Sequence, residues 1–195
     1  MTDEMQNPYL KADLKPHFLD RAVARVACFD IVNIMAASVA LAGEYEMSEA
    51  EEDPEPNSNY KLHMQLAEPR LSQLLLQIAV FVRSFDDVMS ATESSAAYAA
   101  HAAATDGENY IGILDGEGDF RLREACNKII HATDFRPIYD RVERDMGNGD
   151  FRPAWHLTGE IELLGTQAKK EWNAVLHVQP FLEIVLDRIA FEPDA

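Results

Sequence analysis

Four polar side chains in one short segment have the chemistry to handle a phosphate group. The segment LREACNKIIHAT spans residues 122–133 and holds Arg123, Asn127, Lys128 and His131. A neutral imidazole can take a proton from a 2′-hydroxyl, and a protonated one can supply a proton to a leaving oxygen. A guanidinium or ammonium group stabilises charge on phosphoryl oxygens, and an amide can orient the phosphate or the imidazole. These residue types have the chemistry to cleave RNA without a metal ion, with His131 as the acid or base.

The spacing of these residues sets what a single helix can bring together. Asn127 and His131 are four positions apart, so they share one helical face with Glu124. Arg123 is a weaker partner, because a rise of 1.5 Å per residue places its Cα about 12 Å from that of His131 along the axis. Arg123 and His131 could act on one phosphate only if their side chains are extended or if a second chain contributes one of the two residues. The residue directly before Asn127 is Cys126, which supplies no positive charge.

The segment LREACNKIIHA resembles the signature helix of HEPN domains, which are α-helical bundles and in many cases metal-independent RNases. Their motif is an arginine, a gap of four to six residues and a histidine, often with an asparagine directly after the arginine. Asn127 and His131 match this pattern, whereas Cys126 occupies the arginine position. Arg123 is separated from His131 by seven residues, one more than the family gap allows. The resemblance implies a homodimer with His131 in a cleft, Asn127 as a positioning residue, and Arg123, Lys128 or a partner's arginine as the stabilising charge.

The elements around the segment are predicted to be long one-sided helices. Apolar residues recur every three or four positions, which is typical of helices packed in an antiparallel bundle. The predicted helices cover 16–42, about 67–89, about 93–104, 119–133 with Asp119 as N-cap, and 136–146. Together they predict a helical bundle over 16–146 within a single domain of residues 1–195.

The C-terminal part changes to a period of two. In HLTGEIELLG and EWNAVLHV, apolar and polar residues alternate on either side of a short loop, which predicts a β-hairpin over 154–179. Trp155 and Trp172 are then hairpin packing residues. Pro180 opens a last short helix over 180–190. The predicted fold class is therefore mainly α, a HEPN-like bundle with a C-terminal hairpin and helix.

The charge of the chain bears on its partners. The net charge is −17, and nucleic-acid binders usually present a basic face, so the charge disfavours RNA. Residues 43–58 hold seven acids and no base, and we expect a flexible acidic loop over 43–60. Residues 120–144 hold six bases and four acids, so the segment with His131 is locally positive.

Three functions remain open on these grounds. The first is a HEPN-like RNase of a defence or toxin–antitoxin type system. The second is a non-catalytic HEPN-like module that binds another protein, which the cysteine at position 126 and the net charge favour. The third is an acidic protein that occupies a nucleic-acid-binding surface. A fourth interpretation treats the polar residues of the helix as a solvated face without a function of their own.

No cofactor or metal site is predicted. The six histidines lack metal-ligand spacing, and Asp86 and Asp87 at the end of a helix are expected to be solvated. Cys28 and Cys126 are expected to be buried, reduced thiols. The most apolar segment, 26–42, is short for a membrane span and contains polar residues, so a cytoplasmic protein with a buried helix is expected.

Overall fold

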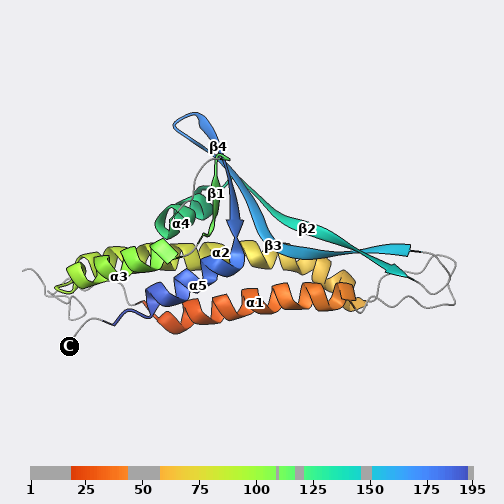
Figure 1. Cartoon of the computed structure of the whole chain (residues 1–195), viewed down its shortest axis with the longest axis horizontal. Helices are drawn as coiled ribbons and strands as arrows, with labels where there is room; N and C mark the ends of the chain where they lie inside the picture. The colour runs from red at the N-terminus through yellow and green to blue at the C-terminus, as the bar shows by residue number, and fades with distance from the viewer. Residues whose placement is uncertain (1–18, 44–57, 109, 117–120, 146–150, 193–195) are drawn as a thin grey trace, which may run out of the picture.

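The computed structural model describes residues 19–43, 58–108, 110–116, 121–145 and 151–192. Five helices and four strands lie within these ranges, and the chain is mainly α-helical, as predicted (Figure 1). In chain order the elements are α1 (Arg21–Gly43), α2 (Ser58–Ser90), α3 (Ser95–Glu108), β1 (Gly112–Leu114), α4 (Leu122–His131), β2 (Asp134–Asp145), β3 (Phe151–Gln167), β4 (Lys170–His177) and α5 (Val178–Ile189).

The two longest helices, α1 and α2, form an antiparallel pair at the base of the molecule (Figure 1). Ala42 packs beside Tyr60 at one end of the pair, and Ala24 packs in one cluster with Phe85 at the other. α2 buries the predicted stripe of apolar residues: Leu71, Leu74, Leu75, Ile78, Val82, Phe85 and Met89. Among the described helices α1 alone is long and apolar enough to cross a membrane, and 28% of its most apolar window is buried.

α2 begins earlier than predicted. Its predicted start near Ala67 is wrong, because the helix runs from Ser58 through Pro69 without ending. Tyr60 shows the physical reason: its hydroxyl donates to the Trp155 carbonyl at 3.0 Å and accepts from the Trp155 N–H at 2.9 Å. This contact with β3 holds the first turns of α2 in place despite the proline. Residues 58–60 of the predicted acidic loop are thus helical, and residues 44–57 lie outside the described residues.

The strands form one antiparallel sheet in the order β1-β4-β3-β2. The predicted helix over 136–146 is wrong, because Asp134–Asp145 is a strand paired with β3 along its length. The segment contains the β-branched and aromatic residues Ile138, Tyr139 and Val142, and pairing with a 17-residue partner overrides its weak helical pattern. β2 is an edge strand, so Pro137 is tolerated there beside the irregularity in register. The bundle predicted over 16–146 therefore includes two strands.

The predicted hairpin is confirmed as β3 and β4. Buried Leu157, Ile161 and Leu163 alternate along β3, and Trp172, Ala174 and Leu176 alternate along β4. Ala168 and Lys169 form its two-residue turn with φ of 50° and 68°. Gly165 faces the indole of Trp172 across the pair, where an added Cβ would overlap the ring. The hairpin is longer than predicted and is flanked by β1 and β2.

The other two helices of the bundle, α3 and α5, both pack against α2 and against each other. α5 follows β4 directly and buries Phe181, Leu182, Val185 and Ile189, close to the predicted 180–190. α3 occupies most of the alanine-rich segment predicted to be a weak helix. α1 begins at Arg21, where the Asp20 carboxylate accepts the Ala22 N–H at 2.8 Å, and residues 16–18 lie outside the described residues. The predicted N-cap of α4, Asp119, also lies outside them.

Candidate functional site on helix α4

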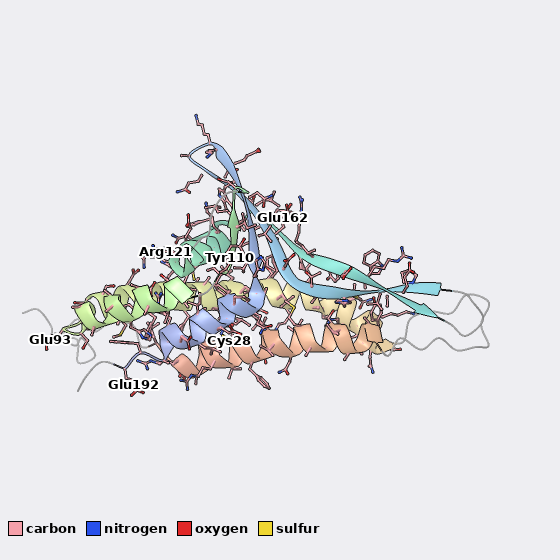
Figure 2. All side chains as sticks on the ribbon, viewed as in Figure 1. Cys28, Glu93, Tyr110, Arg121, Glu162 and Glu192 are labelled. Carbon is pink, nitrogen blue, oxygen red and sulfur yellow. The ribbon has the colours of Figure 1, made fainter. Side chains whose placement is uncertain are left out.

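α4 carries the candidate residues on one side and core residues on the other. It lies above α2 in Figure 1, on the opposite side of α2 from α1, and also packs against β3 and α5. Leu122, Ala125, Cys126 and Ile129 are its buried residues, and their spacing of three and four fits a one-sided helix. Figure 2 shows Arg121 at the start of α4 and Glu162 on the neighbouring sheet.

Cys126, at the position of the motif arginine, faces the interior. Its side chain is fully buried, as predicted, and burial raises the pKa of its thiol above the ordinary value. Asp86 raises this pKa further, whereas Arg83 and Arg188 lower it. The two arginines that act on this thiol belong to α2 and α5.

Asn127 is held by one of these arginines. Arg83, on α2, donates from Nη1 to Oδ1 of Asn127. Within the described residues the buried Nε of Arg83 has no hydrogen-bond partner. The contact brings a guanidinium to the polar face of α4, one helical turn before His131. The sequence pattern did not predict a role for Arg83, because 44 positions separate it from Asn127.

Arg123 is directed away from the predicted phosphate site. Its Nη2 donates to the Asp87 carboxylate at 3.0 Å, and its Nη1 lies 3.5 Å from the Asp86 carboxylate. Both acids belong to the end of α2. Arg123 therefore ties the first turn of α4 to α2, and the structure does not bring it to His131.

Lys128 has an aromatic partner. Its Nζ lies 4.3 Å from the centre of the Trp172 ring, which is a cation–π distance. Trp172 is itself buried, as predicted for a hairpin packing residue, whereas Trp155 is 44% exposed. The lysine stem therefore covers the edge of the core. In this arrangement the charge of Lys128 contributes to the packing of α4 against the hairpin.

His131 is the last residue of α4 and is exposed. Its side chain makes no hydrogen bond or ion pair with any residue that the structure describes. Its backbone carbonyl lies close to β3, since a Cβ added at Gly165 would be 2.9 Å from it. Of the four predicted residues, Asn127 and His131 share the polar face of α4, while Arg123 and Lys128 are drawn to different neighbours.

A buried ionic cluster lies beneath α4. It consists of Asp86, Tyr98, Asp106 and Arg188, which we call the Asp86 cluster. Arg188 donates from Nη1 to Asp86 at 3.1 Å and from Nη2 to Asp106 at 2.6 Å. Tyr98 donates its hydroxyl hydrogen to the same oxygen of Asp86. The side chains of Asp86 and Arg188 are only 7% and 3% exposed, so solvent does not screen this pair.

The pKa values in the Asp86 cluster follow from burial and charge. Burial raises the pKa of Tyr98, and its bond to Asp86 raises it further. Burial also raises the pKa of Asp106, although Arg188 partly opposes this. Burial lowers the pKa of Arg188, but Asp106 and Asp86 outweigh this effect and raise it. Arg188 is therefore charged and its positive charge is neutralised inside the fold.

Asp86 corrects one prediction. Asp86 and Asp87 were expected to form a solvated pair, and only Asp87, with a side chain 63% exposed, fits this. Asp86 continues the buried stripe of α2, four residues after Val82 and three before Met89. The sequence does contain a signal for this burial: Asp86 occupies a core position in an otherwise apolar stripe, and an acid in such a position needs a buried partner.

The other histidines that the structure describes lie apart from α4 and have separate surroundings. His101 contacts the Asp187 carbonyl at 2.9 Å, and His177 lies 3.8 Å from Glu160. Burial lowers the pKa of His63, whose Nε2 is buried without a partner among the described residues. His17 lies outside the described residues. Within the part of the chain that the structure describes, no group of three or more His, Cys, Asp or Glu could hold a metal ion.

Comparison with known proteins adds no relative. No family model, no curated protein and no solved structure matches the chain. Function is therefore inferred from the geometry of α4 and from the charge of the chain.

Proposed function

We propose that this chain is a HEPN-like helical protein that acts as a non-catalytic protein-binding module, in the setting of a defence or toxin–antitoxin type system. One observation carries the proposal: the cations of the α4 motif have intramolecular partners. Arg123 pairs with Asp87 and Asp86, and Lys128 lies over Trp172. An RNA phosphate would have to compete with these partners for each charge.

Electrostatics support the same conclusion. At a net charge of −17 the chain repels a nucleic-acid backbone at long range. His131 has no carboxylate or hydroxyl partner in the described part of the chain that would set its tautomer. A cytoplasmic binding module needs neither a histidine held in one tautomer nor a basic face.

Incubation of the full chain with a mixture of structured and single-stranded RNA tests the proposal. We expect the wild type and His131→Ala to give the same amount of cleavage, at the level of buffer alone. Cleavage by the wild type that disappears in His131→Ala would overturn the proposal. The positive test is co-purification with the products of adjacent genes after co-expression, and failure to recover any of them would count against a binding role.

A second candidate, a metal-independent RNase, has one specific observation in its favour. Arg83 contacts Asn127 and so supplies a guanidinium from α2 to the face that also carries His131. This would replace the arginine that the motif lacks at Cys126. In that case His131 would act as acid or base, Asn127 would orient the phosphate and Arg83 would stabilise its charge.

Arg83→Gln distinguishes this candidate from contamination by a host nuclease. If the chain is an RNase, Arg83→Gln and His131→Ala both lose cleavage, while Arg141→Gln on the edge strand β2 retains it. Arg141 is a matched control, because it is an exposed arginine that pairs with Glu143 at 2.9 Å on β2, away from α4. Equal cleavage by all three variants would assign the activity to a contaminant.

A further inference from the structure

α1 presents an apolar strip to solvent although its other side is packed in the core. Ala24, Ala27, Cys28 and Ile31 face inward and are buried. On the outer side Val26 is 59% exposed and Phe29 is 66% exposed. Charged residues make up 26% of the chain, so apolar residues at such exposed positions are not explained by a lack of charged ones. An exposed apolar strip of this kind indicates a contact surface.

The exposed strip has the spacing of a coiled-coil seam. Exposed residues follow one another at alternating intervals of four and three along α1: Ala22, Val26, Phe29, Asn33, Ala36 and Ala40. This is the a/d pattern of the heptad repeat, in which each such residue meets the equivalent residue of a partner helix. The alanines let two helices approach closely at both ends, and Val26 and Phe29 supply the bulk. We call these six residues the α1 seam.

The one polar residue of the α1 seam, Asn33, specifies the orientation of the partner. Asn33 occupies an a position, where a single asparagine fixes register and favours a two-stranded parallel pair. Its side chain has no hydrogen-bond partner in the described part of the chain. Across a two-fold axis two copies of Asn33 would meet and bond to each other.

Charges beside the α1 seam are self-complementary in the same orientation. Arg25 precedes Val26 at a g position, and Asp30 follows Phe29 at an e position, five residues later. In a parallel pair a g residue meets the e residue five positions on in the partner, so Arg25 of each chain meets Asp30 of the other. Asp30 already accepts from Arg70 through Oδ2 at 3.0 Å, which leaves Oδ1 for the second guanidinium. An antiparallel pair instead brings g positions opposite g positions, so Arg25 would not meet Asp30.

We propose that α1 of two copies of this chain pack in parallel about a two-fold axis, with the α1 seam as the interface and reciprocal Arg25–Asp30 pairs at its edges. α1 has 23 residues and spans about 34 Å, or three heptads. Val32 and Val39, each more than half exposed, flank the α1 seam and widen the contact. The occupant is a second copy rather than a lipid surface, because Arg25, Asp30 and Asn33 have no partners in hydrocarbon.

The proposal is independent of whether α4 cleaves RNA. α4 and α1 lie on opposite sides of α2, so this dimer leaves the two copies of His131 apart (Figure 1). A composite cleft between two motif helices would need a different interface. If the protein forms this dimer and cleaves RNA, the proposed function is wrong and the proposed dimer stands. If it is a monomer and does not cleave RNA, the proposed dimer is wrong and the proposed function stands.

Sedimentation velocity of the full chain, from about 1 to about 100 µM, tests the interface. We expect the wild type to be a dimer at the upper end. Phe29→Glu should weaken association by about 100-fold or more, because an unpaired carboxylate would have to be buried. Leu76→Glu is the matched control, since Leu76 is an exposed leucine on α2, and it should sediment as the wild type does. A monomeric wild type, or equal effects of both variants, would overturn the proposal.

Charge exchange tests the parallel orientation. Arg25→Glu and Asp30→Lys should each weaken the dimer alone, because each places like charges opposite one another. An equimolar mixture of the two variants should restore it, since in a mixed dimer the two introduced side chains face each other and the two native ones, Arg25 and Asp30, also pair. No gain in dimer on mixing would overturn the parallel pair. A wild type that floats with neutral phosphatidylcholine vesicles and sediments as a monomer without them would show a lipid surface instead, and would also overturn it.

Discussion

Asp86→Asn should destabilise the fold strongly, although the substitution preserves the shape of the side chain. Asp86 accepts from Tyr98 and from Arg188 at 3.1 Å, and it lies 3.5 Å from Arg123. Breaking a buried ion pair by neutralising one partner costs about 3–5 kcal/mol. Arg188 retains Asp106 at 2.6 Å, so we expect the low end, about 3 kcal/mol.

Asp87→Asn is the matched control, because Asp87 is the adjacent acid, also pairs with Arg123 and has a side chain 63% exposed. Neutralising an exposed partner should cost less than about 1 kcal/mol. Equilibrium urea unfolding, followed by circular dichroism, measures both. With an m-value of about 2 kcal/mol per molar, the midpoint of Asp86→Asn should fall by about 1.5 M. Equal midpoints for the two variants would refute the conclusion that Asp86 is a buried member of an ionic cluster.

Three further changes test the packing and ionisation described above. Burial lowers the pKa of His63, so its contribution to stability is present above pH 6.5 and is lost as the pH falls through the lowered value. His63→Gln should therefore reduce the drop in urea midpoint between pH 7.5 and pH 5.5. The same drop in the variant as in the wild type would contradict this. Gly165→Ala should cost about 1–3 kcal/mol in urea unfolding, because the new methyl group overlaps the Trp172 indole, and a wild-type midpoint would show that the hairpin can adjust. Lys169→Gly should raise the free energy of unfolding by about 0.5–1 kcal/mol, because Lys169 has a φ of 68° in the turn, where glycine is favoured. Ala168→Gly should have a similar effect, since Ala168 has a φ of 50°. A lower free energy of unfolding in either variant would contradict the turn geometry.

The sequence predicts those elements whose pattern is regular over several turns or strand residues. The stripe of α2, the alternation in β3 and β4, and the apolar side of α5 each repeat a clear period, and these elements are confirmed. The prediction for 136–146 was wrong because the segment is short and mixed in pattern, so pairing with β3 decided its structure. The predicted start of α2 was wrong because the contact of Tyr60 with β3 outweighs the local signal of Pro69.

The candidate site was predictable only where its residues lie on one helix. Asn127 and His131 share a face because they are four positions apart, and Cys126 is buried as expected. Arg83 could not be assigned to Asn127, because nothing in a local pattern joins residues of α2 to residues of α4. The partners of Asp86 come from α3, α4 and α5, so only the tertiary fold reveals why an acid is tolerated there.

A cleavage assay tests the central claim, that the cations of the α4 motif are committed to internal contacts and that the protein does not cut RNA. Wild type and His131→Ala are compared on a denaturing gel, with protein in excess over a labelled RNA at low salt, where weak electrostatic binding is favoured. We expect no wild-type cleavage above that of His131→Ala. Cleavage by the wild type that both His131→Ala and Arg83→Gln abolish would contradict the claim.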